Sequence, residues 1–330
     1  MRKLLSAIVL TLCLSVSATA QVYFQNTMYG FNQFAYNPAA AGFNQLGMDK
    51  GLNLTLLGRQ QWLGIAGAPR LSTLTLNAPA GNLGGGVGAT LVVDKLGPLT
   101  STGMDFAYAF HILGRGDDDG LRLSIGVSGG FRQTSLNGDW IYDASNGSDP
   151  VLAGGKTSAL VPSLNAGIYL TDSEGKFFAG LSGQNLLEPS IEGLLLDSRG
   201  EVSTVPRSMF LIGGYRFDLG VEPGKSTLTP TIMARTDGLF PPQVDLNLYW
   251  NYKPVVFGGG YRFFNDSFSA MMGVNISDRT FVAYSYDYTM NALNAVGDVN
   301  THEIIISYTF PGSEGKEAKK VDILDNPDKL

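Results

Sequence analysis

Apolar and polar residues alternate one by one over long stretches of this chain, and this pattern constrains its fold more than any other feature. From Leu121 to Arg132, leucine, isoleucine, valine and phenylalanine fall on one parity, and arginine and serine on the other. The same alternation recurs over residues 244–252 and 282–289. It is typical of strands with one apolar and one polar face. A tilted strand needs ~9–11 residues to cross a bilayer, so these runs are long enough for a membrane strand.

The composition supports a membrane protein built of strands. Charged residues make up only 16% of the 330 residues, while aromatic residues make up 11% and glycine occurs 42 times. Disordered chains are rich in charge and poor in aromatic residues, so disorder is excluded. After the N-terminus no run of ~18 apolar residues occurs, which excludes a helical membrane protein. The net charge of −6 excludes a basic nucleic-acid-binding surface, so no nucleic acid partner is expected.

Turn signals divide the alternating region into about fourteen segments, the even number expected of an outer-membrane barrel. The expected segments start near residues 51, 70, 83, 99, 120, 157, 175, 207, 225, 243, 255, 267, 279 and 301. The long connections, 135–156, 186–206 and 289–300, all follow odd-numbered segments, whereas even-numbered segments end in short turns. A soluble β-sandwich has no reason to sort its connections in this way. The sequence therefore predicts an all-β, transmembrane antiparallel β-barrel in the outer membrane of a Gram-negative cell.

We expect the chain to consist of four successive parts. Residues 1–20 carry a basic start, an apolar stretch and the small-x-small sequence that ends at Ala20, so they are predicted to be a signal peptide. Residues 21–50 precede the first strand, residues 51–310 form the barrel, and residues 311–330 form a charged tail. Both termini are expected in the periplasm. The tail is either a solvated terminus or a docking segment for a periplasmic partner.

No motif supports catalysis or metal binding. Residues 126–130 match the G-x-S-x-G pattern of serine hydrolases, but they lie within an alternating strand rather than at a strand-to-helix turn. His111 and His302 are the only histidines and are isolated, and the one cysteine, Cys13, lies in the predicted signal peptide. We therefore expect no enzyme activity, no catalytic residue, no metal and no cofactor.

Several charged residues share the polar parity of their strands and are expected to face the lumen. We expect them to pair with one another and fill a narrow pore, although a role in selecting small solutes stays open. These lumen-facing candidates are Asp105, Arg122, Arg132, Arg216 and Arg235.

Two segments near the N-terminus do not alternate and are candidates for binding a protein partner. Residues 31–42 read FNQFAYNPAAAG, and residues 59–69 bring Trp62 close to Arg59 and Gln61. Such a tryptophan is typical of a binding hot spot, and the alternative is an aromatic anchor at the membrane interface. The partner-binding candidates are Asn37, Pro38, Gly42, Arg59, Gln61, Trp62, Pro69, Asp94 and Gly97.

These same residues resemble the PorP/SprF family. The resemblance rests on Asn37-Pro38-Ala39 with Gly42, on Arg59-x-Gln61-Trp62 with Gly67-Ala68-Pro69, and on Asp94-x-x-Gly97, and it extends from Gln21 to Phe310. It implies an outer-membrane barrel of the Bacteroidota type IX secretion and gliding machinery, without catalytic residues.

The resemblance also implies partners. Secreted adhesin-like proteins are expected at the outer loops, and periplasmic type IX components or a peptidoglycan-binding protein at the turns and tail. We expect the barrel, surrounded by outer-membrane lipid, to be a docking platform for secretion or surface attachment of large proteins. The alternative is a diffusion channel or small-molecule transporter.

Overall fold

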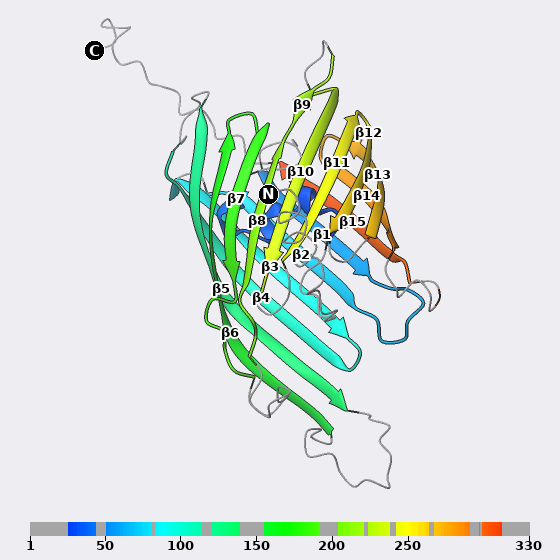
Figure 1. The fold of residues 1–330 in the computed structure, drawn as a ribbon. Coiled ribbons are helices and arrows are strands. Elements are labelled where there is room, and N and C mark those ends of the chain that lie inside the picture. The colour runs from blue at the N-terminus through cyan, green and yellow to red at the C-terminus, as the bar shows by residue number, and fades with distance from the viewer. Residues whose placement is uncertain are drawn as a thin grey trace, which may run out of the picture.

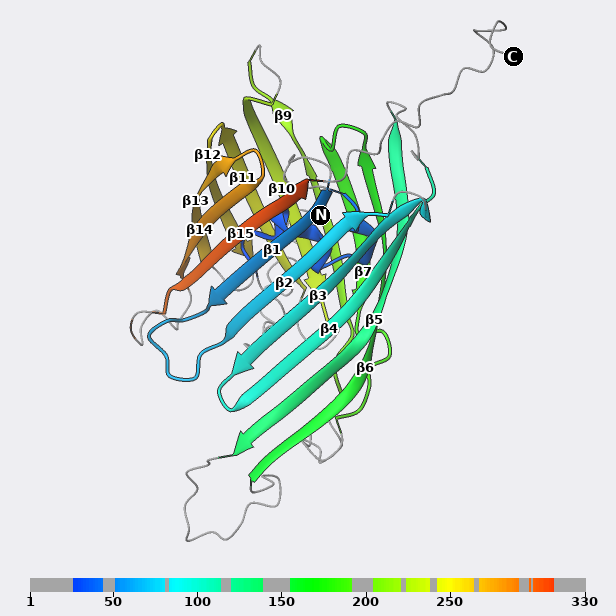
Figure 2. The same ribbon diagram turned by 180° about the vertical axis from the view of Figure 1, so that it is seen from behind.

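The chain forms a closed antiparallel β-barrel in this computed structural model (Figures 1 and 2). Fifteen strands form one sheet in which neighbours in sequence pair, and β11 pairs with β10 to close it. Strands β8 and β9 both pair with β10 and only Arg216 separates them, so they count as one interrupted strand. The barrel therefore has fourteen transmembrane strands, and the predicted fold class is confirmed.

The structure describes residues 26–43, 51–80, 83–113, 120–138, 155–191, 204–220, 224–237, 242–263, 267–290, 297 and 299–311. The predicted signal peptide lies outside these residues, as does the predicted tail apart from Pro311. The strands are β1 (Gly51–Gln60), β2 (Arg70–Pro79), β3 (Gly85–Leu96), β4 (Leu99–His111), β5 (Leu121–Gly138), β6 (Gly155–Asp172), β7 (Phe177–Gln184), β8 (Ser208–Tyr215), β9 (Phe217–Asp218), β10 (Ser226–Thr236), β11 (Gln243–Tyr252), β12 (Val255–Phe263), β13 (Ser267–Ser277), β14 (Thr280–Thr289) and β15 (Thr301–Pro311). The 3₁₀ helices are η1 (Tyr29–Phe31), η2 (Gln33–Ala35) and η3 (Pro38–Ala40).

Turn residues place the strand starts close to the predicted positions. β1, β2, β4, β11, β12, β13 and β15 begin at the predicted residue, and β3 begins at Gly85 rather than 83. Proline, glycine, asparagine and aspartate explain this agreement, because they favour turns at places that are visible in the sequence.

The two ends of the barrel differ in their connections. The end where β1 begins and β15 ends carries short turns such as 253–254 and 278–279, and we call it the turn end. The opposite end, the loop end, carries the long connections 61–69, 139–154, 185–207 and 290–300, together with the shorter connections 97–98, 237–242 and 264–266. Strands β5 and β6 extend beyond their neighbours at the loop end (Figures 1 and 2).

The alternation places apolar side chains outward and polar ones inward. Phe131 and Leu160 are 62% and 67% exposed on the outer wall, whereas Thr75, Ser285 and Ser307 are buried inside. Only lipid can solvate such an apolar outer surface. Among the described residues no helix is long and apolar enough to span a membrane.

Candidate functional site

Residues 26–43, which we call the inner segment, lie inside the barrel (Figure 1). Their short helices carry apolar residues that pack against the inner wall. Met28 joins a buried cluster with Leu57 and Tyr249, and Tyr36 joins another with Phe210 and Ile212. The lumen therefore contains a packed core between this segment and the wall.

Glu303 holds the start of the inner segment. Its carboxylate, on β15, accepts hydrogen bonds from the backbone N–H groups of Thr27 at 3.0 Å and Met28 at 2.8 Å. The Arg59 guanidinium, on β1, donates to the same carboxylate at 3.1 Å. Glu303 is 1% exposed, so three charge-assisted or backbone bonds replace the water that a buried carboxylate loses.

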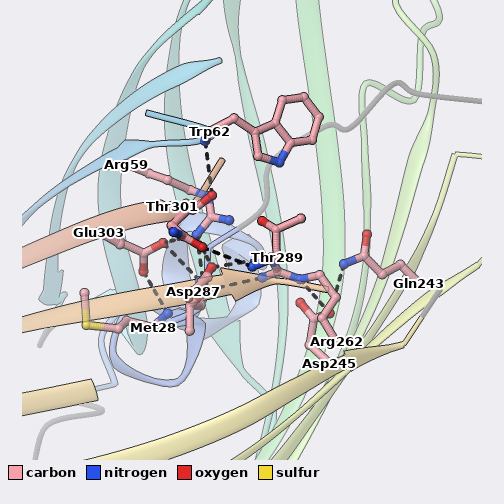
Figure 3. Close-up of polar contacts among 12 residues, drawn as sticks. Met28, Arg59, Trp62, Gln243, Asp245, Arg262, Asp287, Thr289, Thr301 and Glu303 are labelled. Atoms are coloured by element: carbon pink, nitrogen blue, oxygen red, sulfur yellow. Dashed lines mark hydrogen bonds and ion pairs between the residues drawn. The ribbon is translucent and has the colours of Figure 1, made fainter. Parts of the chain in front are cut away.

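A second carboxylate, Asp287 on β14, extends this arrangement (Figure 3). Arg59 contacts Asp287 at 2.9 Å, and the Thr27 hydroxyl donates to Asp287 at 2.6 Å. Arg262 on β12 lies 3.6 Å from Asp287 and 3.1 Å from Asp245 on β11. We call Arg59, Arg262, Asp245, Asp287 and Glu303 the latch.

The charges around the latch are balanced. Arg235 on β10 lies close enough to interact electrostatically with Asp245, which adds a third cation to the three carboxylates. Buried charges persist only when they are paired, because each one loses several kcal/mol of hydration. The latch and Arg235 together thus form a charge-balanced network that spans β10, β11, β12, β14, β15 and β1.

Hydrogen bonds between neutral side chains and backbone groups hold the other half of the inner segment. The Asn37 side chain accepts from the Ala39 N–H at 2.9 Å and donates to the Ile168 carbonyl of β6 at 2.9 Å. It thereby caps η3 and ties it to the wall at once. Ser182 on β7 donates to the Tyr36 carbonyl at 2.8 Å.

Glycines in the wall permit this half to approach closely. A Cβ at Gly126 of β5 would lie 2.3 Å from the Ala39 nitrogen, and one at Gly167 of β6 would lie 2.1 Å from the Asn37 amide oxygen. No side chain fits at these distances, so only glycine permits the contact. Gly86 and Gly88 of β3 meet the segment in the same way, and with Gly126 and Gly167 they form what we call the glycine wall.

At the loop end, residues 61–69 rest on two neighbouring connections. The Trp62 N–H donates to the Thr301 hydroxyl at 3.3 Å, and the Leu63 N–H donates to the Asn300 carbonyl at 2.9 Å. Gly97 donates to the Gly67 carbonyl at 2.8 Å. We call residues 61–69 with Gly97 the shelf. It is ordered by hydrogen bonds, and Leu63 is 47% exposed on it.

The predicted partner-binding residues divide between the interior and the shelf. Asn37 and Pro38 are buried in the inner segment, and Gly42 has φ +83° with its backbone against Gly86. Arg59 belongs to β1 rather than to the loop-end connection, and its side chain points into the latch. Their contacts thus lie within the barrel, and contact with another protein stays a prediction for them.

The remaining candidates lie at the loop end. Gln61 is buried, Trp62 and Pro69 are half-buried, and Gly97 is exposed. Trp62 has φ +50°, a left-handed conformation that costs a residue with a side chain roughly 1–2 kcal/mol. Asp94 is half-buried in β3.

The predicted lumen-facing residues occupy several levels. Arg132 and Asp105 line a cavity of about 20 Å³ between the inner segment and the wall, which has room for about one water molecule. Asp105 accepts from the Ser163 hydroxyl there. Arg122 is half-buried in β5, and Arg235 donates to the Gln243 amide.

Arg216 lies at the turn end. It donates to the main-chain carbonyl of Glu174 at 2.8 Å. Beside it, the Lys176 amine contacts Glu174 at 2.6 Å and Asp218 at 3.1 Å, and these hydrogen bonds raise the pKa of Lys176 above its ordinary value. This cluster joins the turn after β6 to the interrupted strand.

Sequence reasoning missed most of the latch. Arg262, Asp245, Asp287 and Glu303 were not among the lumen candidates, although each is the charged residue of an alternating strand. Their parity was a usable signal, because a charge on the face opposite to lipid-facing residues must point inward. Their mutual contacts had no signal, since Arg59 is separated from Glu303 by 244 residues.

The sequence matches one family profile. The family described as Type IX secretion system membrane protein PorP/SprF matches residues 18–308. None of the curated proteins matches the chain.

The comparison with solved structures finds similar chains at low sequence identity. The CymD monoaromatic hydrocarbon channel has 13% sequence identity and a TM-score of 0.52, with coverage of 86% of this chain and 94% of that one. The P. putida toluene transporter TodX has 10% identity and a TM-score of 0.48, with coverage of 90% and 97%. The Acinetobacter baumannii outer membrane protein Omp33 has 6% identity and a TM-score of 0.45, with coverage of 80% and 100%. At 13% identity the likeness to the CymD channel concerns the fold alone.

Proposed function

Because this chain belongs to the PorP/SprF family of type IX secretion system membrane proteins, we propose that its barrel is a non-enzymatic docking platform of that machinery. Family membership makes the protein an outer-membrane component of a multi-protein secretion apparatus. Our proposal is that large secreted proteins bind the loop end and do not pass through the barrel.

The inner segment is the observation that carries this proposal. It occupies the lumen between the latch and the glycine wall, and it is bonded to both sides of the barrel. A folded protein could enter only if these contacts broke together. Breaking a buried ion pair alone costs ~3–5 kcal/mol, so a large conduit would require a costly rearrangement.

The shelf supports the same reading. The backbone of residues 61–69 is held by hydrogen bonds to residues 300 and 301 and to Gly97, so little conformational entropy would be lost when a partner binds. Trp62 is kept in a left-handed conformation, and strain of this kind is often retained at functional sites. The exposed Leu63 beside it offers an apolar contact.

The two ends would serve different partners. Secreted adhesin-like proteins would bind the loop end, on the outside of the cell. Periplasmic type IX components or a peptidoglycan-binding protein would bind the turn end and residues 311–330, with both termini in the periplasm. The charged cluster of Lys176, Glu174 and Asp218 is a polar surface at that end.

A pull-down from native membranes in mild detergent tests the proposal. The unaltered chain should retain secreted proteins and type IX components. Leu63→Asp should lose the secreted proteins, whereas the control Leu83→Asp, which alters a 63% exposed leucine at the turn end, should keep them. Truncation after Phe310 should lose periplasmic proteins alone.

The rival function is a diffusion channel or small-molecule transporter. The purified barrel would then conduct ions steadily in a planar bilayer and bring no protein partners through purification. That combination would overturn the platform. A barrel that is silent in the bilayer and carries partners supports it.

A further inference from the structure

Two cations face each other directly on the outer wall near the loop end. Arg70 of β2 pairs in register with Lys95 of β3, and both side chains are exposed. They point outward, because Leu71, next to Arg70, and Val92, three residues before Lys95, are both buried on the opposite, inward parity. Like charges opposite each other on one face of a sheet repel, so this pair destabilises the barrel unless an anion lies between them.

Protein carboxylates do not supply that anion. Among the residues that the structure describes, neither Arg70 nor Lys95 forms an ion pair, and Asp94, the nearest acid in sequence, lies on the opposite parity. The paired residues form one row across the outer wall. Beyond the pair of Lys95 and Arg70, Arg70 pairs with Gln60, and Gln60 pairs with His302. The row thus has donors but no acidic side chain.

The row lies at the edge of the lipid-facing surface. Farther from the loop end than this row, the outer wall is apolar and exposed. Ile304 of β15, two residues after His302, is 47% exposed, and Leu91 of β3 and Leu56 of β1 are 38% and 47% exposed. At the row itself, the Tyr286 ring packs edge-on against His302, with their ring centroids 5.4 Å apart. Aromatic residues of this kind mark the headgroup level of a bilayer.

We propose that Arg70 and Lys95 bind the phosphate of an anionic membrane lipid in the leaflet around the loop end. A phosphate between them relieves their repulsion, because it accepts hydrogen bonds from both the Arg70 guanidinium and the Lys95 amine. The acyl chains then lie along the apolar wall below. This lipid site depends on the barrel spanning a membrane and not on the docking role.

The test measures binding of lipid A, which carries two phosphates, to the purified full chain by native mass spectrometry. The variant is Arg70→Gln/Lys95→Gln. The control is Lys225→Gln/Lys253→Gln, which removes two exposed lysines at the turn end. Basic residues near an anionic surface contribute enough that loss of two should weaken binding by about 30-fold. The control should bind as the unaltered chain does.

Two further arms identify the ligand chemistry. Dephosphorylated lipid A should bind the unaltered chain and the variant equally weakly, and millimolar inorganic phosphate should not displace lipid A. Equal binding of lipid A by the chain and both double variants would overturn the site, and displacement by inorganic phosphate would overturn the lipid as its ligand. Heat-dependent migration on gels verifies that each barrel is folded. If the double variant does not fold, Arg70→Gln and Lys95→Gln are measured singly, with the same outcomes.

Discussion

The two halves of the inner segment are held inside the barrel by different physics. Residues 26–31 depend on charge: Thr27 and Met28 bond to Glu303 and Asp287 within the latch. Residues 34–42 depend on shape, because the backbone of Ala39 and Ala41 and the side chains of Phe34 and Asn37 lie against the glycine wall. Their hydrogen bonds go to neutral groups. Strands from opposite sides of the barrel supply the two kinds of contact. One half is therefore sensitive to loss of a charge, and the other to gain of a methyl group.

Single cysteines can report on each half separately. The chain's one cysteine is Cys13, which lies outside the inner segment. Met28→Cys reports on the first half and Ala35→Cys on the second, since both positions are buried. A thiol reagent labels each cysteine only when its half leaves the wall.

The largest effect is expected from Glu303→Ala. Two backbone N–H groups lose their acceptor and Arg59 becomes a poorly compensated buried charge, so the free energy of unfolding should fall by about 3–5 kcal/mol. Urea unfolding in lipid vesicles measures this. When Glu303→Ala is combined with each reporter, the thiol reagent should label the cysteine of Met28→Cys faster, whereas the labelling rate of Ala35→Cys should change little.

The control for this charge deletion is Glu188→Ala, which breaks an exposed ion pair with Arg207. Exposed pairs contribute little, so its unfolding should match that of the unaltered chain. If Glu303→Ala behaved like this control, the latch would not be what holds the first half.

The next largest effect is expected from Gly126→Ala. Its new Cβ would meet the backbone of Ala39 at 2.3 Å, and overpacking of this kind costs about 1–3 kcal/mol. Labelling at Ala35→Cys should increase, and labelling at Met28→Cys should not. The control is Gly129→Ala on the same strand, where the nearest atom is 3.7 Å away. Equal labelling in both variants would contradict the role of the glycine wall.

A smaller effect is expected from Asn37→Ala. This change removes the cap of η3 and the bond to β6, which should lower the free energy of unfolding by about 1–2 kcal/mol. Urea unfolding is compared with that of Asn137→Ala, whose side chain is exposed at the end of β5. A loss no greater than that of the control would show that packing alone holds η3.

The smallest effect is expected from Thr27→Val. The hydroxyl donates to Asp287, but the backbone bonds to Glu303 remain, so the loss should be about 1 kcal/mol. Met28→Cys labelling should rise slightly. The control in the same unfolding assay is Thr102→Val, because the Thr102 side chain faces outward from the barrel. A loss as large as that of Glu303→Ala would mean that the hydroxyl, rather than the carboxylate, organises the latch.

The barrel could be read from the sequence because its signals are local. Each strand alternates with a period of two, and each turn carries its own glycine, proline or polar residues. The starts of β1, β2 and β4 were accordingly predicted to the residue. The same period places Arg132 and Asp105 on the lumen face.

The candidate site could be predicted only in part from the sequence. Asn37, Arg59 and Trp62 stood out as unusual residues, but the sequence did not distinguish an exposed partner surface from an internal contact. Asn37 and Arg59 are buried because strands distant in sequence surround them. The close approach of Ala39 to Gly126 was equally hidden, because glycine in a strand has several explanations.

Local periodicity thus settled the strands, their faces and the ends that carry long connections, since each depends on neighbours a few residues apart. Closure of the sheet settled which inward side chains meet. Arg59 reaches Asp287, 228 residues away, only because β1 pairs with β15 and β15 with β14. Alternation along a strand indicates which face a side chain occupies. Strand register and closure of the sheet bring its partners within bonding distance.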